Sequence, residues 1–95
     1  MFIVLLKFAD NKADAPRHMD GHKAWLEQGF ADGVFILSGS VQPKQGGAVF
    51  AANTTRDELE HRIAQDPFVA EDVVHAEIIE IDASRADDRL SFLCD

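Results

Sequence analysis

The order of elements that the sequence predicts, strand, helix, strand, strand, helix and strand, is typical of a ferredoxin-like α+β domain. In this fold class, two helices cover one face of a four-stranded antiparallel sheet. The size of the chain agrees with the prediction, because 95 residues, of which 46% are hydrophobic, suit a single domain with its own core.

An apolar run and a set of boundary residues mark the first strand and the first helix. The strand formers of residues 2–8 end at polar residues, and a helix over residues 15–32 follows. Pro16 suits the first turn of this helix, Asp14 can cap it, and Gly33 suits a left-handed stop.

A β-hairpin is predicted next, over residues 34–52. Its strands are the apolar stretches 34–41 and 48–52. The connecting residues 42–47 contain Pro and Gly and have turn chemistry throughout.

The second helix begins with a capping box. Thr55 is followed three residues later by Glu58, which is the spacing that lets the two residues satisfy free backbone N–H groups. We expect this helix to end near Asp66, because Pro67 disfavours the helical conformation for the residue before it.

The chain closes with a turn, a last strand and a tail. Residues 68–72 are expected to form a short turn and residues 74–81 the fourth strand. We therefore predict one domain over residues 1–82 and a polar tail over residues 83–95. The tail ends in apolar residues, which are Leu90, Phe92, Leu93 and Cys94.

Charge and cysteine content exclude several classes of protein. The net charge of −8 makes nucleic acid an unexpected partner, because binding phosphates needs clustered Lys and Arg. This charge lies wholly in residues 51–95. The single cysteine, Cys94, excludes an internal disulfide and a multi-cysteine metal site. The apolar run Phe2–Leu6 is far shorter than the ~20 residues of a spanning helix, so we expect a cytoplasmic protein with no membrane partner.

The first two strands carry apolar side chains on both faces of the predicted sheet. The alternating sets are Phe2, Val4, Leu6 and Phe8 against Ile3 and Leu5, and Phe35, Leu37 and Val41 against Val34 and Ile36. Because the helices can cover only one face, we expect a homodimer through the other face. The alternative is that the tail folds over this face, and the tail could also contribute to the dimer contact.

The topology brings several polar residues to one end of the sheet. The two helices run antiparallel and the first two strands run parallel, so His22 of the first helix should lie near Asp66 of the second. The segment Ser38, Gly39 and Ser40, at the end of the second strand, should lie at the same end. We expect a small-molecule cleft at this place, with apolar walls from Phe8, Phe68 and Trp25.

The chemistry of this cluster is acid–base chemistry. If Asp66 accepts the N–H of His22, it fixes the tautomer of the imidazole and leaves the other ring nitrogen as a general acid or base. Gly39 would let a ligand approach the backbone, and Ser38 and Ser40 could bind it through hydrogen bonds. The alternatives are a structural His–Asp hydrogen bond between two helix ends and core packing for Trp25.

The sequence resembles the YciI-like (YCII-related) family of small dimeric α/β-barrel proteins over residues 1–82. The matching features are His22 with Lys23-Ala24-Trp25-Leu26, then Gly33, Ser38-Gly39, Gly46-Gly47 and Asp66-Pro67-Phe68.

The resemblance implies that His22 and Asp66 form an active-site dyad and that Gly39 lines the cleft. The family usually has Pro at the position of Ser40. The family resemblance further implies proton transfer on a small cyclic or aromatic substrate, without a metal or an organic cofactor. A non-catalytic dimer that binds a small molecule or an anion, and a purely structural module, stay open as alternatives.

A metal site is a weaker interpretation of the first helix. His18 and His22 are four residues apart, and together with Asp14 they could hold a metal ion. No HExxH-type signature surrounds them, and a lone pair of histidines at this spacing is common. We therefore expect no metal.

Overall fold

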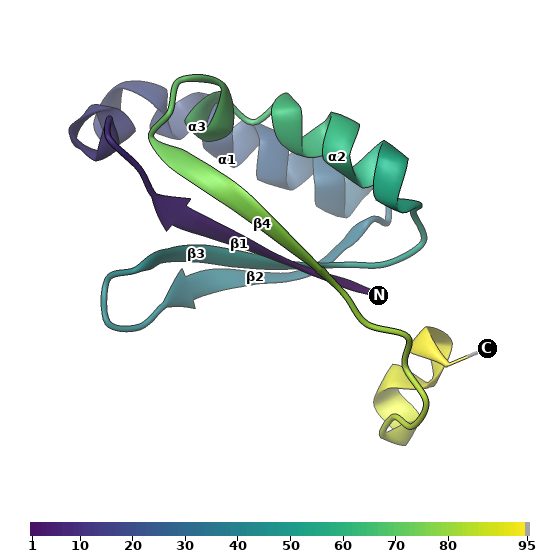
Figure 1. Ribbon diagram of the computed structural model, residues 1–95. Helices are drawn as coiled ribbons and strands as arrows, with labels where there is room; N and C mark the ends of the chain where they lie inside the picture. The colour runs from purple at the N-terminus through teal and green to yellow at the C-terminus, as the bar shows by residue number, and fades with distance from the viewer. Residues whose placement is uncertain (95) are drawn as a thin grey trace.

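The computed structural model describes residues 1–94 and has a four-stranded antiparallel sheet with helices on one face (Figure 1). This architecture confirms the predicted ferredoxin-like α+β class. Asp95, the last residue of the expected tail, lies outside the described residues. The elements are β1 (Phe2–Phe8), α1 (Ala15–Ala31), β2 (Phe35–Val41), β3 (Gly46–Ala51), α2 (Arg56–Ala64), α3 (Pro67–Ala70) and β4 (Val74–Glu80).

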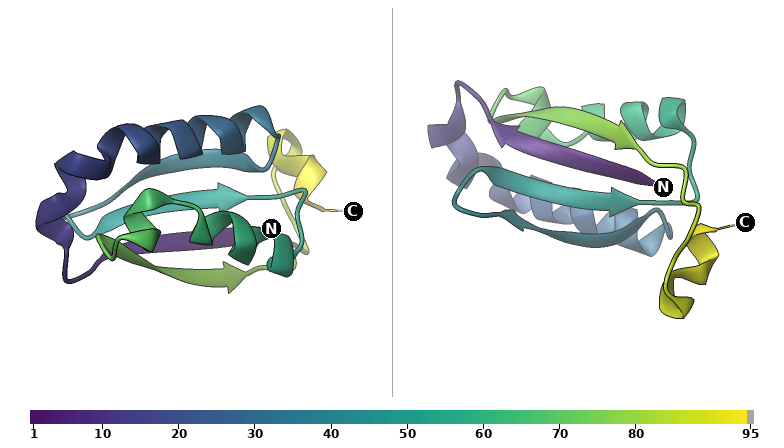
Figure 2. Two further views of the ribbon diagram at one scale, coloured as in Figure 1. Left: turned by 90° about the horizontal axis from the view of Figure 1, so that it is seen from above. Right: turned by 60° about the horizontal axis from the view of Figure 1, so that its bottom comes forward.

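The strand order is β2-β3-β1-β4, and every neighbouring pair is antiparallel. Since β1 and β2 both run antiparallel to β3, they run parallel to each other, as predicted. All three helices lie on one face, with α1 on the β2 side and α2 and α3 on the β4 side (Figure 2). We call the opposite face, which none of these three helices covers, the open face.

The boundaries of α1 agree with the sequence, but its cap does not. Pro16 lies in the first turn, and Gly33 follows the helix with a φ of 75°. Asp14 occupies the N-cap position, yet its side chain makes no capping hydrogen bond. The reason is that Asp14 ends a 3-10 turn, Lys12–Asp14, and so lacks the extended backbone from which N-cap side chains reach the helix.

The second helix is capped by Thr55, which makes the first of the two hydrogen bonds of the predicted capping box, whereas the expected turn after the helix is itself a short helix. The hydroxyl of Thr55 accepts the N–H of Glu58 at 3.2 Å. Pro67 both ends α2 and begins α3, because its fixed φ suits the first position of a helix. The carboxylate of Asp66 caps α3 by accepting the N–H of Phe68 at 3.0 Å.

The hairpin differs from the prediction in its start and in its faces. β3 begins at Gly46, two residues earlier than expected. A bulge in β2 between Phe35 and Leu37 places these two side chains on opposite faces, where strict alternation puts them together. Phe35 is buried under α1, and Leu37 is 50% exposed on the open face.

The core lies between the helices and the sheet. The indole N–H of Trp25 donates to the backbone oxygen of Arg62 at 2.9 Å and so joins α1 to α2. Arg62 of α2 also donates a hydrogen bond to the carboxylate of Asp32, at the end of α1, at 2.9 Å. The hydrogen bonds from Gln28 and Arg62 hold the pKa of Asp32 below its usual value. The buried side chains of this core include Phe2, Val4, Leu6, Trp25, Phe35, Val49, Leu59, Ile63 and Phe68.

Gly29 sets how closely α1 can approach the sheet. A Cβ atom at this position would overlap the ring of Phe35. Overpacking costs about 1–3 kcal/mol, and the better helix propensity of alanine returns about 1 kcal/mol. Because the ring of Phe35 is itself buried, we expect the upper part of this range, so that Gly29→Ala lowers the free energy of unfolding by about 1–2 kcal/mol in urea titrations. The exposed neighbour Lys23→Ala should leave it within about 0.5 kcal/mol, and equal effects would contradict this packing.

Candidate active site

A cavity of about 380 Å³ lies between the N-terminal half of α1, α3 and the sheet. It exists because the floor beneath α1 is made of small residues. On the helix-facing side, Ser40 pairs with Gly47, and Gly47 pairs with Leu6 across the sheet. Ser38 pairs with Val49 in the next row. Where a continuous core would need large side chains, β2 supplies two hydroxymethyl groups, and the space stays open.

His22 forms part of the wall of this cavity. Its ring stacks on Phe68, with the ring centres 4.1 Å apart and the planes within 5°. Its Nδ1 lies 2.9 Å from Oδ1 of Asp66. The side chain is 14% exposed, so the ring is held on one side by the protein and remains accessible to a ligand.

Asp66 is fully buried and has two partners. Its Oδ1 receives both Nδ1 of His22 and the N–H of Phe68, while Oδ2 is buried without a hydrogen bond to any described residue. An ionised carboxylate can only accept, so with Asp66 ionised the hydrogen of this contact belongs to Nδ1 of His22. Nε2 makes no hydrogen bond within residues 1–94 and is the ring nitrogen left for a ligand.

The predicted binding residues fall into two groups. Ser38, Ser40, Phe68 and Phe8 all line the cavity, as does the backbone of Gly39. The side-chain position of Gly39 lies on the open face, since its partner in the register is Ala48 and the next residue along that row is Leu5.

Trp25 is the exception among the expected residues, because it does not line the cavity. It is 8% exposed and packs edge-on against Phe35, with its N–H bound to the α2 backbone. The alternative role of Trp25, packing in the core, therefore agrees with its position. The proposed site does not include Trp25.

Several lining residues of α1, which are Ala15, Met19 and Leu26, were not among the site residues expected from the sequence. Ala15, Met19, His22 and Leu26 follow one another at steps of four, three and four residues and form one stripe of the helix facing the cavity. The position of a histidine within an apolar stripe of the helix was the sequence feature that could have indicated these lining residues. Gly46, Gly47 and Ala48 of β3 complete the lining.

The expectations about a metal site and about a membrane partner concern other parts of the described chain. Within the described chain, no three His, Cys, Asp or Glu side chains gather closely enough to hold a metal ion, so Asp14, His18 and His22 are not assembled as ligands. No helix among residues 1–94 has the length and apolar character needed to cross a membrane.

A comparison with known protein families identifies the family of this chain. The family model of the YCII-related domain matches residues 1–82. The chain belongs to the YCII-related domain family. This confirms the resemblance drawn from His22, Gly33, the Ser38-Gly39 pair and the Asp66–Phe68 segment. Among curated proteins, none matches this sequence.

A solved structure has the same fold as this YCII-related domain. It is the 5-chloro-2-hydroxyhydroquinone dehydrochlorinase TftG from Burkholderia phenoliruptrix AC1100, in complex with 2,5-dihydroxybenzoquinone. The TM-score is 0.68 and the sequence identity 14%, and the match covers 85% of this chain and 93% of that one. At this identity the likeness concerns the fold.

Proposed function

We propose that this YCII-related protein is an acid/base enzyme that works without a cofactor on a small cyclic or aromatic metabolite. The observation that carries the proposal is the 2.9 Å contact between Nδ1 of His22 and Oδ1 of Asp66 at the wall of an apolar cavity. A histidine oriented by a buried carboxylate, with its second nitrogen free, is the arrangement that proton transfer requires.

In the proposed mechanism, the Nδ1–H of His22 donates to Asp66 throughout the reaction. Nε2 removes a proton from the bound substrate, and the imidazolium that forms is stabilised by the neighbouring carboxylate. Nε2 then returns the proton to another atom of the same substrate or to a leaving group. General acid–base catalysis of this kind contributes about 10²–10⁴-fold to a rate.

The lining of the cavity supports an uncharged ring that bears oxygen substituents. Most of the wall is apolar or aromatic, and no Lys or Arg stands among the lining residues found in the described chain. The hydroxyls of Ser38 and Ser40 can each donate to and accept from a ring oxygen. TftG was solved with 2,5-dihydroxybenzoquinone, which is a six-membered ring that bears four oxygen substituents.

A non-catalytic binding module is the second candidate. The contact between His22 and Asp66 also ties α1 to the junction of α2 and α3, and Asp66 caps α3 as well. A protein that only binds a ring compound could keep these residues for stability alone. The two candidates differ in whether the bound molecule is changed.

We also propose that the protein is a homodimer through the open face. One large apolar side chain from each strand forms a continuous row across this face, in the order Leu37, Phe50, Ile3 and Ile79. Leu37 and Ile79 are 50% and 38% exposed. A second copy of the same row would bury it across a two-fold axis.

The cavity assignment is tested by filling it. Ser40→Leu should weaken binding of hydroquinone and 2,5-dihydroxybenzoquinone at least tenfold in isothermal titration, because the leucine side chain occupies the space of the ring. Ser40→Ala keeps that space and should weaken binding only a few-fold. Binding that is unaffected by Ser40→Leu would place the ligand elsewhere.

A turnover screen then separates the two candidates. Ring compounds that bind are incubated with the protein, and the products and solvent deuterium incorporation are followed by NMR. We expect turnover or exchange that Ser40→Leu reduces. Binding without any chemical change or exchange across the panel would favour the binding module.

A further inference from the structure

The C-terminal arm, residues 83–94, lies beyond the part of the chain that the YCII-related family model matches. It follows β4 directly, after Ile81 and Met1 have paired through two hydrogen bonds of 2.8 and 2.9 Å. The arm contains a short 3-10 helix, Asp88–Leu93, which exposes 45% of Leu90 and 51% of Phe92.

The hydrogen bonds found for the arm are internal to it. Leu90 bonds to Asp87, Cys94 bonds to Ser91, and the carboxylate of Asp87 accepts from Arg89. The arm is therefore folded on itself, while Leu90 and Phe92 are about half exposed to solvent in the single chain. Exposing such residues together is unfavourable, at about 25 cal/mol for each Å² of apolar surface.

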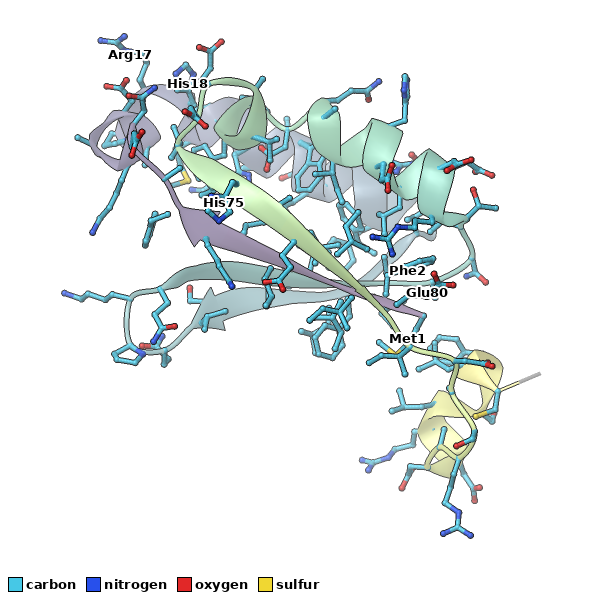
Figure 3. All side chains as sticks on the ribbon, viewed as in Figure 1. Met1, Phe2, Arg17, His18, His75 and Glu80 are labelled. Carbon is cyan, nitrogen blue, oxygen red and sulfur yellow. The ribbon has the colours of Figure 1, made fainter. Side chains whose placement is uncertain are left out.

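The position of the arm is specific. It stands on the side of the sheet opposite the helices, which is the side of the open face (Figure 1). In the view that brings the bottom of the molecule forward, the arm stands past the end of the sheet where β4 ends (Figure 2). It leaves at the end where Met1 and Glu80 lie (Figure 3).

The open face is apolar at this same end. The row of Leu37, Phe50, Ile3 and Ile79 comes from the beginnings of β1 and β2 and the ends of β3 and β4. Toward the other end of the sheet, the open face carries Lys7, Glu77 and His75, with Lys7 and Glu77 paired at 2.8 Å. The arm therefore begins next to the apolar part of the open face.

We propose that the arm packs against a second copy of this chain, with Leu90 and Phe92 seated on the partner and extending the contact made by the open face. The inference rests on the homodimer proposed above. When two open faces meet across a two-fold axis, each arm stands beside the other protomer, and the contact is made twice. The six residues 82–87, which bend at Ser84, connect the end of the sheet to the 3-10 helix, and such a segment can span at most about 20 Å.

The first test measures dimer dissociation with the full-length protein. Leu90→Ser combined with Phe92→Ser should raise the dimer dissociation constant at least tenfold in sedimentation equilibrium. The neighbouring Arg89→Gln, which changes the same helix without removing apolar surface, should leave it within twofold. Leu37→Asp alters the open face and should give monomers. If Leu37→Asp gives monomers while the double arm variant dimerises normally, the arm proposal is wrong and the dimer proposal stands.

The second test asks to which chain the arm docks. Cys94 is the only cysteine of the sequence and can be cross-linked selectively. Native chains are mixed with chains carrying Cys94→Ser and either Leu37→Cys or Ile79→Cys, and a short bismaleimide is added. We expect a cross-linked species that contains one chain of each kind.

The same experiment can contradict the proposal. Single chains that carry both Cys94 and Leu37→Cys or Ile79→Cys report an arm folded over its own sheet, as a cross-link within one chain. Cross-linking within chains and none between the mixed chains would overturn the inference. Dimers without cross-links of either kind would overturn it as well, because the arm would then contact neither open face.

Discussion

Replacing His22 with glutamine is expected to lower kcat by about 10²–10⁴-fold for any ring compound that the protein turns over, since this is the range of general acid–base catalysis. Glutamine can still donate a hydrogen bond to Asp66 from its amide, but it cannot take up a proton at the position of Nε2. Initial rates at saturating substrate, followed by NMR or absorbance, measure the effect.

Substrate binding and protein stability serve as the controls for His22→Gln. KM and the free energy of unfolding should change far less than kcat, because the group lost acts on the reacting proton. His75→Gln, on the open face away from the cavity, should keep native turnover. A His22→Gln variant with native kcat would remove the imidazole from the mechanism.

Substitution of Asp66 is expected to give the second large effect. Two different substitutions separate its role in stability from its role in turnover. Asp66→Ala leaves the N–H of Phe68 and Nδ1 of His22 without an acceptor in a buried place, at about 1–3 kcal/mol for each group. We expect the free energy of unfolding to fall by about 2–4 kcal/mol. Denaturant titration measures this loss.

Asp66→Asn keeps an oxygen for both hydrogen bonds but removes the negative charge. Its amide N–H₂ would take the place of Oδ2, which has no partner among the described residues, so we expect a loss of about 1–2 kcal/mol. Turnover should fall much further, because the amide cannot stabilise the imidazolium form of His22. A variant that loses stability yet keeps kcat would show that Asp66 is structural.

The sequence predicted the meeting of His22 and Asp66 because that meeting depends on topology. Once the order of elements is known, antiparallel helices over one sheet bring the beginning of α1 to the end of α2. The capping box at Thr55 and the stop at Gly33 were also predictable, since both depend on residues within one turn.

The features that could not be predicted arise from tertiary contacts. The bulge between Phe35 and Leu37 moves the side chains that follow it to the other face of β2. No single residue of the strand predicts this bulge. Trp25 and Leu26 are neighbouring apolar residues of the same helix, and only the packing against α2 and Phe35 decides that Trp25 enters the core. The cavity itself follows from register, because Ser40 and Gly47 become a floor only when they lie side by side.

The central claim is that Nε2 of His22 meets the ligand in this cavity, and ¹⁵N NMR of the imidazole groups tests it most directly. The protein has four histidines, of which His18, His61 and His75 serve as internal controls. Titration with hydroquinone, or with the tightest binder of the panel, should move the Nε2 signal of His22 along a saturable curve while Nδ1 stays protonated. Saturable binding that leaves the His22 nitrogens unchanged, or no binding of any ring compound at millimolar concentration, would contradict the account.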